Sequence, residues 1–141
     1  TSFRGKKMKQ ARTRTFVILE ADLPNEFGLT ETMGQLPNAK QAKSFVDGVR
    51  DRVAACAEDD LTVTVTDLGH HVSGREEVTW WRIEAEVTDE RTLTQLMAIT
   101  RRGSHVAQIG FTPAGKRTLA AGGFDALALR AMKRLGNIST G

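Results

Sequence analysis

The sequence predicts an α+β domain in which helices flank a central antiparallel sheet, an α/β/α sandwich. Apolar and polar residues alternate from Val78 to Val87, which is typical of a half-buried strand because successive side chains point to opposite faces. The segment from Leu93 to Phe111 folds back about Arg102 and Gly103 as a hairpin whose two faces are both partly apolar. Such a hairpin belongs near the centre of a sheet, and helices must cover both of its sides.

The first half of the chain supplies further strands and one helix. Residues 15–23 contain a short apolar run and are predicted as a strand, while residues 26–33 are either its partner or an extended lead into the helix. Asn38 is a suitable N-cap for a helix over residues 39–58. The apolar residues of that helix recur at spacings of three and four: Ala42, Phe45, Val49, Val53 and Cys56.

The remaining elements are a strand, a loop and a second helix. Residues 61–68 alternate between apolar residues and threonine, which predicts a half-buried strand, and residues 69–74 are predicted as a loop. A helix over residues 123–135 closes on Gly136 as its C-cap. Its apolar face is formed by Phe124, Leu127, Ala128, Ala131 and Leu135.

Length and composition predict one domain with its own core, because the chain has 141 residues of which 40% are hydrophobic and 26% charged. No run of about eighteen apolar residues occurs, so we expect no transmembrane segment in this chain. Cys56 is the single cysteine, which excludes an intramolecular disulfide. Because it lies on the apolar stripe of the first helix, we expect a buried, inert thiol.

Charge is unevenly distributed, and it divides the chain into a basic N-terminal arm, residues 1–14, and a single α+β domain, residues 15–138. The arm carries six cationic residues before the first acid, Glu20. Such an arm is suited to an anionic envelope surface, with Lys6, Lys7 and Lys9 as contacts, although a solvated terminus explains the same pattern. We do not expect nucleic acid as a partner, because aromatic residues that could stack on bases are nearly absent from the arm.

No pattern in the sequence indicates a catalytic centre, and we expect neither a metal nor a cofactor. His70 and His71 lie close to Glu76 and Glu77, but the spacing typical of metal ligands is missing, so solvated loop residues are the simpler interpretation. A rival interpretation is a small hydrolase or lyase that uses Glu84, Glu86 or His105.

Trp80 and the arginines near it are the candidate binding residues. Trp81 shares its parity with the apolar set of its strand, whereas Trp80 shares its parity with Arg82. We predict a site for a protein or small-molecule ligand formed by Trp80, Arg82, Arg101 and Arg102. The alternative is that the second helix layer covers Trp80.

Three segments resemble the last third of PsbP-like domains: W-W-R-I-E-A-E-V from residue 80, L-M-A-I-T-R-R-G-S-H-V-A-Q-I-G-F from residue 96 and F-D-A-L-A-L-R-A-M from residue 124. This family includes the Ran-binding Mog protein, the extrinsic proteins of photosystem II, and envelope lipoproteins and receptor-kinase ectodomains of high-GC Gram-positive bacteria. The resemblance implies an α/β/α sandwich and a non-enzymatic binding, sensory or scaffold role outside the cytoplasm. A cytoplasmic protein-interaction domain is the alternative. The resemblance supplies no catalytic residues.

Overall fold

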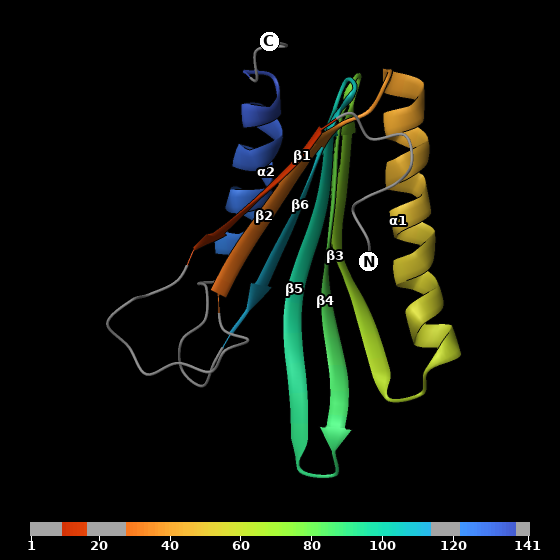
Figure 1. The fold of residues 1–141 in the computed structure, drawn as a ribbon. Helices are drawn as coiled ribbons and strands as arrows, with labels where there is room; N and C mark the ends of the chain where they lie inside the picture. Colours follow the sequence, from red (N-terminus) through yellow and green to blue (C-terminus); the bar gives the residue numbers. More distant parts are fainter. Residues whose placement is uncertain (1–9, 17–27, 114–121, 138–141) are drawn as a thin grey trace.

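The computed structural model describes residues 10–16, 28–113 and 122–137, and it confirms the predicted α+β fold (Figure 1). The described residues form six strands and two helices. Their order along the chain is β1 (Gln10–Phe16), β2 (Gly28–Gln35), α1 (Ala39–Asp59), β3 (Val63–Ser73), β4 (Glu76–Thr88), β5 (Arg91–Arg102), β6 (His105–Thr112) and α2 (Gly123–Leu135).

The strands form one antiparallel sheet in the order β1-β2-β6-β5-β4-β3. The two-faced hairpin β5–β6 lies in the middle of the sheet, as its sequence predicts. Its register pairs Leu96 with Phe111 and Ala98 with Ile109, so these side chains share one face. The hairpin turns at Gly103, whose φ of +59° is a left-handed conformation that glycine adopts without steric cost.

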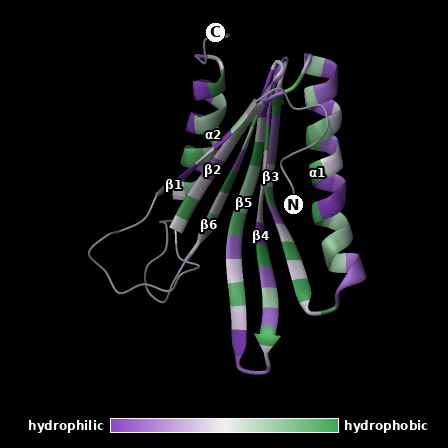
Figure 2. Cartoon of the chain, in the orientation of Figure 1, coloured by the Kyte–Doolittle hydropathy of each residue, from purple (hydrophilic) through white to green (hydrophobic). Residues whose placement is uncertain are grey.

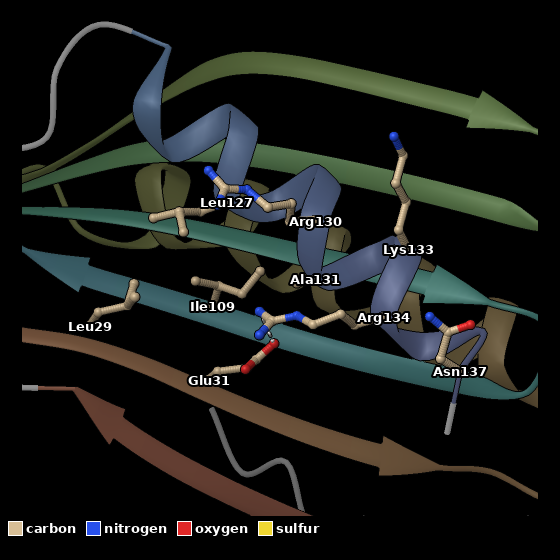
Figure 3. Close-up of a pocket in the computed structure, with 9 residues that line it drawn as sticks. All are labelled: Leu29, Glu31, Ile109, Leu127, Arg130, Ala131, Lys133, Arg134 and Asn137. Carbon is tan, nitrogen blue, oxygen red and sulfur yellow. Dashed lines mark hydrogen bonds and ion pairs between the residues drawn. The ribbon is translucent and has the colours of Figure 1, made fainter. Parts of the chain in front are cut away.

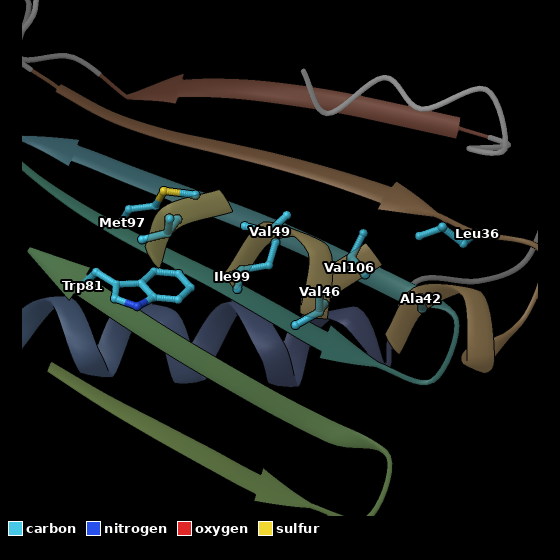
Figure 4. Close-up of a cluster of buried hydrophobic side chains, with 9 residues drawn as sticks. Leu36, Ala42, Val46, Val49, Trp81, Met97, Ile99 and Val106 are labelled. Atoms are coloured by element: carbon cyan, nitrogen blue, oxygen red, sulfur yellow. The ribbon is translucent and has the colours of Figure 1, made fainter. Parts of the chain in front are cut away.

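Helix α1 covers one face of the sheet. It begins after Asn38 because the side chain of Asn38 accepts a hydrogen bond from the backbone N–H of Gln41 at 2.9 Å, which satisfies an otherwise free amide of the first turn. Figure 4 shows its apolar side chains above Trp81 and the hairpin. The buried cluster on this face contains Leu36, Ala42, Val46, Val49, Val53, Trp81, Met97, Ile99 and Val106.

Helix α2 covers the opposite face, so the sheet lies between the two helices (Figure 1). Hydrophobic residues occur along the central strands (Figure 2), and where the helices cover them they occupy both faces: Met97 and Ile99 of β5 pack in the α1 cluster, and Ala98 between them packs beneath α2. The second buried cluster contains Val78, Ala98, Ile109, Phe111, Phe124, Ala128, Ala131 and Met132.

The structure corrects two of the predicted boundaries. The predicted loop over residues 69–74 is wrong through Ser73, because β3 continues to that residue and pairs His70 with Thr79. The sheet also begins at Gln10, inside the segment assigned to the basic arm, and β1 pairs with β2 over its whole length. The part of the predicted first strand at residues 17–23 lies outside the described residues.

Two of the predicted core positions are also wrong. Burial along α1 ends at Val53, so Cys56 in the last turns is exposed, although it continues the apolar spacing. Phe45 is partly buried and packs against the cluster, as its spacing predicts, and its neighbour Val46 is fully buried. Leu61, predicted to open a strand, precedes β3 and is exposed.

Candidate functional site

The predicted binding residues do not all lie on one surface. Trp80 and Arg82 of β4 lie on the face covered by α2, and Arg102 of β5 shares that face because it pairs with Glu76 of the same parity. Arg101 lies on the α1 face, beneath the other helix. The structure therefore brings three of the four residues to one face and separates the fourth from them.

Trp80 is half-buried and packs against the α2 cluster, so the second helix layer partly covers it. Its ring also lies against Gly69 of β3, where a Cβ atom would approach Cζ2 of Trp80 to 2.5 Å. The indole Nε1 is buried and has no hydrogen-bond partner among the described residues. Trp80 thus fills the space between β3 and α2. Arg82, two residues along the strand, is exposed, and its Nε lies 3.9 Å from Oε2 of Glu84.

Arg101 belongs to a buried charge cluster that sequence reasoning did not predict. Its Nε donates to Oε2 of Glu77 at 3.4 Å, and the other oxygen of that carboxylate lies 3.1 Å from Nε2 of His70 and 3.5 Å from Nη1 of Arg50. The Glu77 side chain is only 2% exposed. This buried carboxylate contacts two arginines and a histidine and so joins α1, β3, β4 and β5. The signal available in the sequence was that Glu77 shares its strand parity with Trp81 of the core.

Arg102 holds the end of α2. Its Nη1 donates to the backbone carbonyl of Lys133 at 3.1 Å, which satisfies a carbonyl of the last helical turn. Its Nε lies 3.2 Å from Oε1 of Glu76. Gly136 packs directly beside it, and a Cβ there would force the guanidinium of Arg102 to move. Arg102 also lines a polar cavity of about 650 Å³ together with Arg75 and His105, where the hairpin turns meet α2.

The residues proposed for a hydrolase or lyase do not converge. His105 pairs with Arg102, which pairs with Glu76, so His105 lies level with the start of β4. Glu84 lies eight residues further along β4, a separation of about 26 Å at a rise of about 3.3 Å per residue. Hydrogen bonding to one substrate atom requires about 3 Å from each group. Glu84 and Glu86 therefore cannot act together with His105.

A groove between α2 and the sheet is the strongest candidate site (Figure 3). Its volume is about 450 Å³, within the range typical of small-molecule sites. Apolar side chains from three elements meet in it: Leu29 of β2, Ile109 of β6, and Leu127 and Ala131 of α2. The polar lining residues are Glu31, Arg130, Lys133, Arg134 and Asn137.

The groove combines an apolar floor with charged walls. Glu31 is 4% exposed, and one of its oxygens lies 3.2 Å from Nη2 of Arg134, which reaches down from the helix (Figure 3). Arg130 lies one turn earlier on α2, while the side chain of Lys133 points away from Glu31 (Figure 3). Arg14 of β1 pairs with Glu31 and so stands on the same face, outside the lining of the groove. The lining therefore contains one carboxylate, Glu31, and three cationic side chains: Arg130, Lys133 and Arg134.

Sequence reasoning missed this site, although local signals existed. Arg130, Lys133 and Arg134 are spaced three and four residues apart, which places them on one side of α2. Glu31 shares its parity with Leu29, so an acid among apolar neighbours on one face of β2 was visible once that strand was assigned. The position of α2 relative to β2 was not visible.

Other features concern metals, membranes and the arm. Within the described residues, no group of three or more His, Cys, Asp and Glu side chains is placed to hold a metal ion. In the same residues, no helix has the length and apolar character needed to cross a membrane. Lys6, Lys7 and Lys9 lie outside the described residues.

Comparison of the chain with protein-family models, curated proteins and solved structures finds no match.

Proposed function

We propose that this chain is a non-enzymatic binding module and that the groove between α2 and β2 is its ligand site. The observation that carries the proposal is the meeting of Leu29, Ile109 and Leu127 at a hollow of about 450 Å³ walled by arginines. A few placed polar groups around an apolar pocket are the usual composition of a ligand site, because burial supplies affinity and the polar groups supply orientation.

The layered architecture supports the same proposal. Helices on both faces of an antiparallel sheet are the arrangement that the resemblance to PsbP-like domains implies. In that family the implied role is binding or sensing in the cell envelope, and we extend this role to the chain as part of the proposal. Arg12 and Arg14, the last basic residues of the arm, are exposed on β1, which supports contact with an anionic envelope surface.

Nuclear magnetic resonance of the ¹⁵N-labelled protein tests the groove directly. A fragment library with anionic, neutral and cationic members is titrated, and we expect hits to shift the backbone amides of Leu29, Ile109 and Leu127 together. Hits that cluster elsewhere, or a library without hits, would contradict the proposed site.

A matched pair of variants on α2 sharpens this test. Leu127→Glu places a charge on the groove floor, whereas Ala126→Glu places the same charge on an exposed position next to it. We expect the first to abolish the ligand-induced shifts and the second to preserve them. Circular dichroism of both variants verifies that α2 is retained, and equal binding by the two variants would refute the site.

A further inference from the structure

One arginine of the groove has no counter-charge from the described residues. Glu31 is paired with Arg134 at 3.2 Å, and no ion pair joins Arg130 to another residue that the structure describes. Arg130 lines the groove from α2, one turn before Arg134. The groove therefore keeps an unpaired guanidinium beside a carboxylate that Arg134 already neutralises.

We infer that the groove takes a single-chain amphiphile with a carboxylate head, an alkyl carboxylate. This inference rests on the proposed function and names its ligand class. The head lies at Arg130, whose planar guanidinium can donate two parallel hydrogen bonds to a carboxylate. The alkyl chain lies on Leu29, Ile109 and Leu127, which supply the apolar contact.

The floor of the groove favours an alkyl chain over a peptide. Leu29, Ile109 and Ala131 present side chains, and the backbone amides of β2 and β6 are already used in their ladder. A peptide lying on this floor would bury N–H and C=O groups without partners, and each such group carries a desolvation cost. A hydrocarbon chain has no such groups and incurs no such cost.

The apolar floor sets the length of the tail. Leu29 pairs with Phe111, two residues beyond Ile109 on β6, so Leu29 and Ile109 stand about 7 Å apart along the sheet. A chain of about ten carbons spans roughly 12 Å, given bonds of about 1.5 Å in a zigzag, which is long enough to cover both residues and Leu127 from a head at Arg130. Decanoate is therefore the probe of choice.

The experiment compares three probes by the same amide shifts, each below its micelle concentration. Decanoate has the tail and the head, acetate has the head alone, and decyltrimethylammonium has the tail with a cationic head. We expect decanoate to shift the amides of Leu29, Ile109 and Leu127, acetate to leave them unchanged, and the cationic probe to bind at least about tenfold more weakly.

Arginine variants assign the head. Arg130→Gln removes a charge at the groove, and Arg52→Gln removes the same charge from an exposed position of α1 on the other face. We expect about tenfold weaker decanoate binding for the first, the loss of a charge-assisted contact, and no change for the second. Equal effects of the two variants would overturn the assigned head position.

The outcomes separate this inference from the proposed function. Equal binding of decanoate and decyltrimethylammonium at the groove amides would overturn the carboxylate ligand while the groove stands as a binding site. The same holds if decanoate fails and fragments of another class shift those amides. If neither the alkyl probes nor the fragment library shifts them, both proposals are wrong.

Discussion

The buried carboxylate of Glu77 allows a quantitative test of the charge cluster beneath α1. Arg101, its partner at 3.4 Å, has a side chain that is only 7% exposed. Glu77→Gln leaves that guanidinium buried without a counter-charge, and breaking a buried pair in this way costs about 3–5 kcal/mol. Arg50 and His70 are 37% and 34% exposed, so water screens them and they add little. We expect a loss of about 3 kcal/mol, a large part of the roughly 5–15 kcal/mol that stabilises a typical domain.

The neighbouring acid is a matched control for this substitution. Glu76 lies on the opposite face and pairs with Arg102 at 3.2 Å, but their side chains are 30% and 41% exposed. Glu76→Gln should therefore cost less than about 1 kcal/mol. Urea unfolding of both variants, with an unchanged dependence on denaturant concentration, gives the two free energies. A loss for Glu77→Gln no larger than that for Glu76→Gln would refute the reasoning.

A double variant separates the buried charge from the packing around it. Replacing a buried ion pair by apolar residues of similar volume is often neutral or stabilising, because neither charge then has to be desolvated. We expect Glu77→Leu combined with Arg101→Met to lie within about 1 kcal/mol of the parent protein. If the double variant is as unstable as Glu77→Gln alone, lost packing rather than an unpaired charge explains the loss.

Three further predictions concern the tryptophans, one exposed acid and the basic arm. Trp81→Ala should cost about 3–5 kcal/mol in urea unfolding because Trp81 is 5% exposed in the α1 cluster, and half-buried Trp80→Ala should cost less; the reverse order would contradict the assigned faces. Hydrogen bonds from the hydroxyl and the backbone N–H of Thr62 lower the pKa of Asp60 below its ordinary value, so the stability they contribute is present above that ordinary value and is lost as pH falls through the folded-state pKa. Thr62→Val should raise the Asp60 pKa in an NMR titration, and an unchanged pKa would exclude the hydroxyl as its cause. Binding of the protein to anionic vesicles should weaken as salt is added, and it should be lost when three lysines of the arm are replaced by Ser: Lys6, Lys7 and Lys9. Salt-independent binding would reject the envelope contact.

Local chemistry explains which parts of the fold could be predicted. The β5–β6 hairpin followed from alternation and a glycine turn, and α1 followed from the Asn38 cap, since both signals lie within a few residues. The C-terminal half of β3 escaped prediction because the register shifts between Asp67 and Gly69. That irregularity reverses the parity of the strand, so His70 faces α1 although the alternation before it assigns the position to the other face.

The candidate groove depends on a long-range relation that no local pattern contains. Six strands spaced by about 4.8 Å place the outer strands about 24 Å apart, whereas a helix is about 10–12 Å in diameter. One helix therefore covers about half of each face, and both helices lie over the β5 side of the sheet. Neither described helix extends over the margin formed by β1 and β2, and polar residues stand there, such as Arg14 and the hydrogen-bonded pair Thr13 and Thr32. Helix α2 packs on β4, β5 and β6, and Leu29 lies on β2, the next strand after β6. The groove forms there because the apolar surface of the sheet continues onto β2, beyond the strands that α2 covers.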